Sequence, residues 1–127
     1  MTDEVFARCV IVEGEPSALA SFSVDDIRRR CARRLAAPEI YSHMEGQGVR
    51  YGPRFRVIES LACSADESLA DLSLDADLRQ ELASMAWHPA LLDGALQCVM
   101  GLLLARGEAR SLAPFSVESV SCSAPLD

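Results

Sequence analysis

The most apolar stretch of the chain runs from Trp87 to Arg106 and reads WHPALLDGALQCVMGLLLAR. Pro89 suits the first turn of a helix, where its missing N–H would lack a partner in any case. From there to Leu104, apolar residues fall on every face of a helix, and the polar interruptions are Asp93 and Gln97. Because a helix that is apolar all round is normally buried, we expect a long helix in the centre of the fold.

The first part of the chain predicts a strand and then a charged helix. Residues 5–12 (VFARCVIV) are rich in β-branched side chains, which favour a strand, and the EGEPS that follows predicts a turn. Ser23 is a good N-cap for a helix with two aspartates in its first turn. Pro38 ends this helix, in which apolar residues recur every four positions among five arginines: Ile27, Cys31 and Leu35. The pattern favours an amphipathic helix facing solvent over a basic binding patch.

The remaining segments add strands. Glycines and Pro53 predict a loop, and residues 55–63 alternate enough to form a strand. Residues 67–74 and 112–124 are further strand candidates, whereas 75–85 are polar and predict a surface helix or loop. Strands combined with one long apolar helix indicate the α+β class. We divide the chain into a leading strand and linker (1–22) and one domain (23–127).

Composition and charge narrow the classes of partner. The chain has 127 residues, half of them hydrophobic, which is enough for one domain, and its net charge is −7. Nucleic acids and anionic membranes select basic surfaces, so neither is expected as a partner. The apolar stretch is interrupted and falls short of the roughly 18 consecutive apolar residues of a membrane span.

The five cysteines, at positions 9, 31, 63, 98 and 122, are expected to be free thiols. They form no CxxC pair, their number is odd, and the acidic start of the chain lacks the apolar core of a signal peptide. These features predict a cytoplasmic protein, because thiols stay reduced in that compartment. The two histidines and the scattered thiols do not supply the clustered ligands of a structural zinc, so we expect no metal.

Asp93 and Gln97 are four residues apart and therefore meet on one face of the predicted helix. Burial among leucines should raise the pKa of the Asp93 carboxyl, as in a general acid that is protonated near neutral pH. Gln97 can then orient that carboxyl by a hydrogen bond. In the alternative interpretation, Asp93 caps a backbone N–H near the helix start and takes no part in chemistry. Position alone leaves both interpretations open.

Two motifs connect this chain to a known family. The segment HPALLDGALQ, His88 to Gln97, closely resembles the motif that carries the catalytic aspartate of polyketide synthase dehydratase domains. The segment YSHMEGQGVRYGPRFR, Tyr41 to Arg56, resembles the second signature of that family, a tyrosine followed by GxxYGPxF. Its matching residues here are Gly48, Tyr51, Gly52, Pro53 and Phe55. The resemblance covers roughly residues 23 to 120 and implies a hotdog fold, a curved antiparallel sheet around a long buried helix.

In this family, two hotdog halves form one domain. The first half offers a histidine within HxxxGxxxxP, and the second half offers the aspartate. Together they remove water from a 3-hydroxyacyl chain carried on the phosphopantetheine of an acyl carrier protein, with no other cofactor and no metal. The resemblance implies that Asp93 is the acid, that Gln97 orients it, and that the Tyr51 hydroxyl faces the substrate tunnel. It assigns Gly52 and Pro53 to the shape of the loop, and we expect His88 to cap the helix that Pro89 opens.

The chain departs from the family in length and in its histidine. A double hotdog is about twice as long, HxxxGxxxxP is absent, and the chain stops where the family continues with more strands. His43 with Gly48 and Pro53 fits a spacing that is one residue too long, and we treat that match as coincidence. An incomplete sheet leaves an open edge and an apolar face. We therefore expect a histidine-bearing half, another synthase subunit or a second copy to cover them, or else the chain is a cut piece of a larger synthase.

Three functions follow from these observations. The first is the aspartate half of a 3-hydroxyacyl dehydratase, active only with a histidine from elsewhere. The second is a catalytically inactive module that docks synthase subunits. The third keeps the fold but changes the chemistry to double-bond isomerisation or ring closure, which use the same residue types.

Overall fold

A computed structural model describes residues 9–10, 21–85, 87–108 and 116–120 of the chain. The strand predicted at 5–12 lies mostly outside these residues. Of the strand predicted at 112–124, only residues 116–120 are described, and they form no strand.

The described residues form one antiparallel sheet of three strands, in the order β1 (Arg33–Ala36), β2 (Ile58–Cys63) and β3 (Ser68–Leu72). The strands predicted within 55–63 and 67–74 are confirmed as β2 and β3. β2 begins later than predicted, because the short 3₁₀ helix η1 (Pro53–Phe55) occupies the preceding residues. Sheet and helices together confirm the α+β class.

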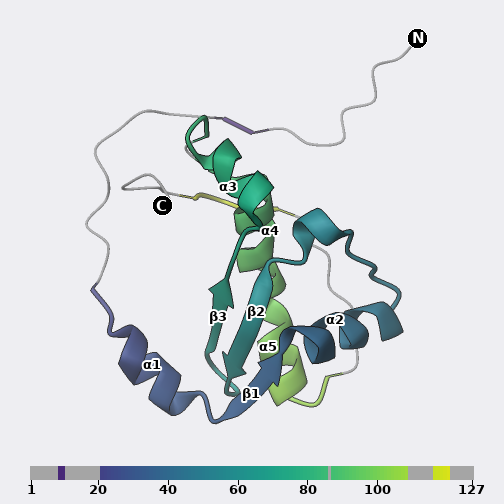
Figure 1. Ribbon diagram of the computed structural model, residues 1–127. Coiled ribbons are helices and arrows are strands. Elements are labelled where there is room, and N and C mark those ends of the chain that lie inside the picture. The colour runs from purple at the N-terminus through teal and green to yellow at the C-terminus, as the bar shows by residue number, and fades with distance from the viewer. Residues whose placement is uncertain (1–8, 11–20, 86, 109–115, 121–127) are drawn as a thin grey trace.

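Helices pack on one face of this sheet (Figure 1). α4 (Pro89–Gln97) and α5 (Val99–Ala105) run along it almost end to end, and α2 (Ala37–Gly46) packs beside α5. Their shared core contains the following buried residues: Leu35, Ile40, Tyr41, Met44, Ile58, Leu61, Cys63, Met100 and Leu103. A second, smaller cluster joins α3 (Ala76–Leu82) to the start of α4: Val57, Leu74, Leu78 and Ala90. Helix α3 confirms the surface element predicted at 75–85.

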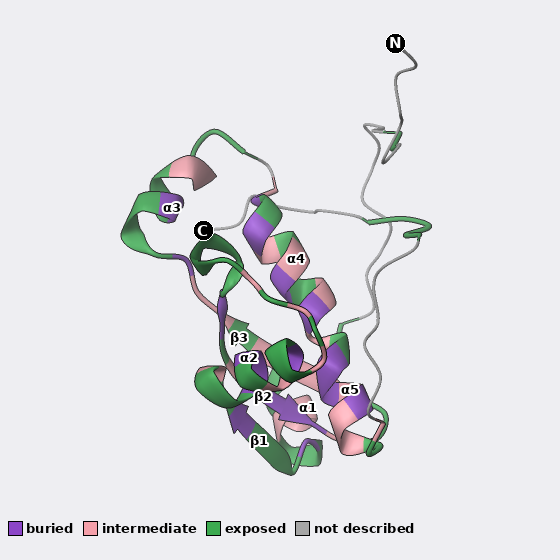
Figure 2. Ribbon diagram, turned by 90° about the vertical axis from the view of Figure 1, so that its right-hand side faces the viewer, coloured by how far each residue is buried: buried purple, intermediate pink, exposed green. Residues whose placement is uncertain are grey.

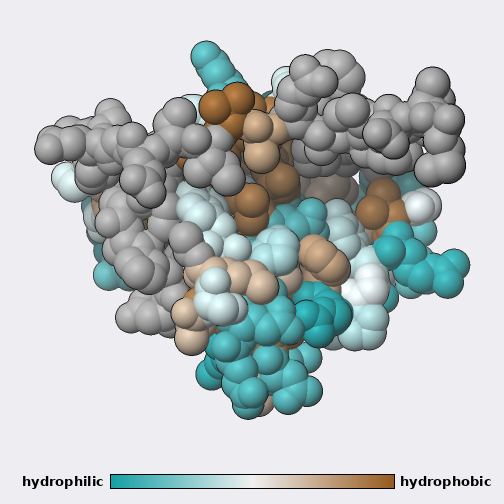
Figure 3. All heavy atoms as spheres, turned by 90° about the horizontal axis from the view of Figure 1, so that it is seen from above, coloured by the Kyte–Doolittle hydropathy of each residue, from teal (hydrophilic) through white to brown (hydrophobic). Residues whose placement is uncertain are grey.

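The predicted long helix is divided at Cys98 into α4 and α5, and both are buried only on the side that faces the sheet (Figure 2). Gly94 and Gly101 lie on that side, where the absent side chains let the helix approach Val57 and Leu61 closely. Leu92 is 36% exposed and Val99 is 42% exposed on the outer side, so the prediction of a helix buried all round is wrong. The three strands cover only one side of the helix. The spacing of apolar residues in the sequence does not show how many strands will pack against a helix. Apolar side chains also reach the surface in the view from above (Figure 3).

The predicted charged helix is shorter than expected. Ser23 caps α1 (Val24–Arg30) as predicted, with its Oγ accepting from the Asp26 N–H at 3.2 Å. The helix ends at Arg30, however, and residues 33–36 form β1, whose Leu35 lies opposite Leu61 of β2. Pro38 lies in the first turn of α2 rather than stopping a helix. Proline favours that position because its missing N–H costs nothing there.

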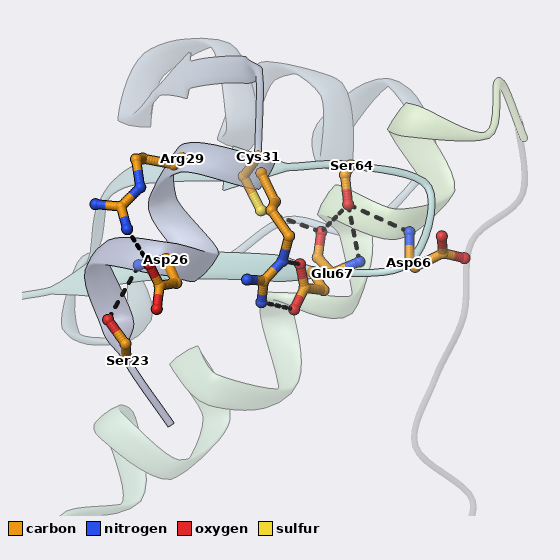
Figure 4. Close-up of polar contacts among 8 residues, drawn as sticks. Ser23, Asp26, Arg29, Cys31, Ser64, Asp66 and Glu67 are labelled. Carbon is orange, nitrogen blue, oxygen red and sulfur yellow. Dashed lines mark hydrogen bonds and ion pairs between the residues drawn. The ribbon is translucent and has the colours of Figure 1, made fainter. Parts of the chain in front are cut away.

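Arginines of α1 bind acidic residues of the same chain (Figure 4). Arg30 donates two hydrogen bonds to the Glu67 carboxylate, at 2.6 and 2.5 Å, beside the turn that joins β2 to β3. Arg28 pairs with Asp71 of β3 at 3.2 Å, and Arg29 pairs with Asp26. The interpretation of α1 as a basic binding patch therefore loses its support, because these charges are already paired.

The Arg30–Glu67 pair predicts how stability depends on pH. The hydrogen bonds from Arg30 hold the pKa of Glu67 below the ordinary 4.5 of a glutamate. Because the folded-state pKa is depressed, the pair stabilises the fold above pH 4.5, and this contribution is lost as pH falls through the folded-state value. We expect Glu67→Gln to lower the free energy of unfolding at pH 7 slightly and to make its fall on acidification less steep. Urea unfolding at a series of pH values measures both effects.

Asp66→Asn is the matched control, since its carboxylate has no hydrogen bond or ion pair among the described residues. If the acid dependence of Glu67→Gln coincides with that of Asp66→Asn, the Arg30 pair contributes nothing.

Candidate active site

Asp93 and Gln97 lie together on α4, as their spacing predicted. Gln97 Nε2 donates to Asp93 Oδ2 at 2.7 Å, which confirms the expected hydrogen bond. Asp93 is half-buried rather than buried, because the sheet covers only one side of its helix. The other carboxyl oxygen, Oδ1, has no hydrogen-bond partner among the described residues and is not one of their fully buried unpaired atoms, so it is open to a ligand.

The side-chain amide of Gln97 is fixed from three directions. Only 3% of Gln97 is exposed. Its Nε2 donates to the Phe55 carbonyl at 3.0 Å as well as to Asp93, and its Oε1 accepts from the Tyr41 hydroxyl at 3.2 Å. Two acceptors at the nitrogen and a donor at the oxygen define one orientation of the amide. Gln97 is therefore held where it can orient the Asp93 carboxyl.

Tyr41, in α2, connects this pair to the sheet. Its buried hydroxyl accepts from the Ile58 N–H at 3.0 Å while it donates to Gln97. Burial, assisted by the negative charge of Asp93, raises the pKa of Tyr41, although its bond with Ile58 and the charge of Arg56 oppose the rise. The hydroxyl therefore remains a donor at neutral pH. Tyr41 lies within the second motif, but its role was not predicted from the sequence. The available signal was its place on the same face of α2 as Met44, which is also buried.

Tyr51 packs against Tyr41, with ring centroids 6.1 Å apart and the planes at 64°. Burial raises the pKa of Tyr51, and the negative charge of Asp93 raises it further. Its hydroxyl has no hydrogen-bond partner among the described residues. The structure thus brings Tyr51 to the neighbourhood of Asp93, and none of the described residues binds its hydroxyl.

The other motif residues shape the backbone around the site. Gly48 has a φ of +85°, a conformation that side chains disfavour, directly after α2. Pro53 opens η1, preceded by Gly52 in an extended conformation. Phe55 is 38% exposed and supplies its carbonyl, rather than its ring, to Gln97.

His88 caps α4, as expected. Its Nδ1 accepts from the Ala90 N–H at 3.2 Å, and Pro89 follows in the first helical turn. The imidazole is 2% exposed. His43, which gave the coincidental motif match, lies in α2 with its Nε2 2.9 Å from Gln47 Nε2.

Removing the Tyr41 hydroxyl should destabilise the fold. Tyr41→Phe leaves the buried Ile58 N–H without its acceptor, so we expect the free energy of unfolding to fall by about 1–2 kcal/mol. Urea denaturation measures the loss. Tyr51→Phe removes a hydroxyl that has no described partner and should change stability little. Equal losses in the two variants would contradict the role given to the Tyr41 hydroxyl.

Three further findings concern the part of the chain that the structure describes. No group of three or more His, Cys, Asp or Glu side chains there could hold a metal. The four cysteines within it are free, and the fifth, at position 122, lies outside. No helix among the same residues is long and apolar enough to cross a membrane.

Comparisons with known proteins point to one family. A family model described as "Polyketide synthase dehydratase N-terminal domain" matches residues 19–127. The chain is 32% identical over 91 residues to polyketide synthase PksN of Bacillus subtilis (strain 168), covering 72% of the chain and 2% of that protein. It is 34% identical over 109 residues to polyketide synthase GfsE of Streptomyces halstedii, covering 84% of the chain and 3% of that protein.

Solved structures show the same similarity. The dehydratase domain from the CurF module of curacin polyketide synthase is 27% identical with a TM-score of 0.63, over 71% of this chain and 32% of that one. A trans-AT polyketide synthase dehydratase domain from Brevibacillus brevis is 26% identical with a TM-score of 0.62, over 67% of this chain and 30% of that one. The expected hotdog fold is thereby confirmed, and the chain spans about a third of such a domain.

Proposed function

Since the chain belongs to the polyketide synthase dehydratase family, we propose that it is the aspartate-bearing half of a dehydratase domain in a modular polyketide synthase. The matching family model is described as an N-terminal domain, and assignment to the C-terminal half is part of the proposal. The observation that carries it is the arrangement around Asp93, with one oxygen bound to Gln97 and the other open to a ligand.

Asp93 acts in this proposal as the general acid. Because Gln97 occupies Oδ2 as a donor, the form of Asp93 that acts as the acid carries its proton on Oδ1. A histidine from another half removes the α-proton of a 3-hydroxyacyl thioester, and the electrons of that C–H bond form the double bond. The C–O bond breaks, and the leaving hydroxyl takes the Oδ1 proton and departs as water. The Gln97 N–H then stabilises the remaining carboxylate.

The proposed dehydratase also requires a carrier protein and a histidine-bearing half. The substrate is carried on the phosphopantetheine of an acyl carrier protein in the cytoplasm, and the reaction uses no metal or further cofactor. The Tyr51 hydroxyl faces the substrate. The histidine comes from a polypeptide with the HxxxGxxxxP motif, which this chain lacks.

A complementation experiment tests the function. The molar mass of the chain is measured by light scattering, alone and mixed with a polypeptide that carries the HxxxGxxxxP half. Dehydration of a 3-hydroxyacyl carrier protein is then followed by the loss of one water in mass spectrometry. We expect a mass increase and turnover in the mixture, and no turnover with either half alone. A stable mixed complex without turnover would contradict the catalytic proposal.

A stable mixed complex without turnover would support the second candidate, an inactive docking module. This candidate is favoured by the exposed apolar residues Leu92 and Val99 on the outer side of the α4 and α5 helices. Docking predicts the mass increase alone, so one pair of measurements separates the two candidates.

A further inference from the structure

His88 carries a buried N–H that its capping role does not use. Because Nδ1 accepts a hydrogen bond from the Ala90 N–H, the proton of the neutral ring resides on Nε2. Nε2 is buried and has no hydrogen-bond partner among the described residues. The acceptor that faces it is Glu81 Oε2 of α3, 3.5 Å away.

The second oxygen of Glu81 is engaged in a different direction. Glu81 Oε1 accepts from Arg54 Nη2 at 2.7 Å, and Arg54 belongs to η1. This hydrogen bond holds the pKa of Glu81 below its ordinary value, so Glu81 is a carboxylate at neutral pH. The Glu81 side chain of α3 therefore faces both η1 and His88, the residue that precedes α4.

These two segments hold the Asp93–Gln97 pair. The residue after Arg54 is Phe55, whose carbonyl accepts from Gln97, and the helix that His88 caps carries Asp93 and Gln97. Glu81 makes no hydrogen bond or ion pair with Asp93 or Gln97 itself. It can influence them by fixing the distance between η1 and the start of α4.

We propose that Glu81 is a positioning residue for the acid site, tying η1 to the N-terminus of α4 through Arg54 and His88. Its significance for catalysis rests on the proposed function, whereas its effect on the geometry of Gln97 does not. Loss of the Glu81 carboxylate lets η1 move relative to α4, which lengthens the hydrogen bond from Gln97 to Phe55 and loosens the orientation of Asp93.

The NMR signals of the side-chain amides in the full-length chain report the environment of Gln97 directly. The sequence has three glutamines, at positions 47, 80 and 97, and no asparagine, so a ¹H–¹⁵N spectrum contains three side-chain NH₂ pairs. Gln97→Glu removes and thus assigns one of them. We expect Glu81→Ala to move the Gln97 pair toward the position of the exposed Gln80 pair. His88→Ser keeps a capping side chain, adds no side-chain amide and lacks the Nε2–H, and should move the Gln97 pair in the same direction by less.

Glu67→Ala is the matched control, because Glu67 also pairs with an arginine and has a similar side-chain exposure, 32% against 35% for Glu81. It should lower stability in urea and leave the Gln97 pair in place. The proposal is overturned if Glu81→Ala does not move that pair, or if Glu67→Ala moves it equally. In a complemented dehydratase, Glu81→Ala should lower kcat several-fold and leave KM unchanged. Failure of the parent to turn over would overturn the proposed function and leave the spectral result intact.

Discussion

Asp93→Asn should lower the rate of dehydration by the complemented chain about 100–10,000-fold, the usual contribution of one general acid or base. Asparagine retains the shape of the side chain and an oxygen that can accept from Gln97. It has no acidic proton to give to the leaving hydroxyl, so the loss falls on the chemical step. Single-turnover mass spectrometry with the carrier-bound substrate separates that step from complex formation.

Asp77→Asn provides the comparison. Asp77 is an exposed residue in the first turn of α3, and its replacement should leave the rate within about twofold of the parent, as surface substitutions usually do. Light scattering should show the same complex for both variants. A rate for Asp93→Asn within about tenfold of the parent, well below the usual loss, would remove Asp93 from the acid role.

Gly101→Val should cause the largest loss of stability. A Cβ at position 101 would lie 3.0 Å from Leu61 Cδ2 and 3.1 Å from Cys63 Cβ, and it would also crowd Ser68 Oγ. The Ser68 hydroxyl donates to the Cys98 carbonyl at 2.8 Å, so the added side chain also disturbs a bond between β3 and the helix. Overpacking of this kind costs about 3 kcal/mol at its upper end. The melting temperature should therefore fall by roughly 10 °C.

Gly46→Val tests the packing explanation, because Gly46 also lies in a helix but a Cβ there meets nothing within 4 Å. Both substitutions add the same side chain at a helical glycine, Gly46 at the last residue of α2 and Gly101 inside α5, and a propensity change at Gly101 costs well under the packing penalty. Calorimetry on both therefore reports mainly the cost of contact with the sheet. Comparable melting temperatures for the two variants would show that the helix is not closely packed at Gly101.

The local signals in the sequence predicted the features that depend on neighbours in the chain. The Ser23 cap, the start of α4 at Pro89 and the Asp93–Gln97 contact all involve residues at most four positions apart. Such contacts follow from helix geometry alone, so composition and spacing are sufficient to predict them.

Contacts between distant segments were not predictable in this way. The spacing of Cys31 and Leu35 suggested one helix, but Leu35 belongs to a strand because it pairs with Leu61, 26 residues later. The site shows the same limit. Tyr41 of α2 binds Gln97 of α4 across 56 residues of sequence, and no local pattern marks a hydroxyl that will bind an amide in another segment.

The hydrogen bond between Tyr41 and Gln97 spans 56 residues. A ribosome that adds about 5–20 residues per second reaches Gln97 roughly 3–11 s after Tyr41. During that interval β2 and β3 can already pair, since a short turn joins them, but the Tyr41 hydroxyl has no amide to bind. A nascent chain that stalls before residue 97 therefore lacks the acid site even if β2 and β3 have already paired. The rate of synthesis thus sets the earliest time at which Gln97 can hold Asp93 in place.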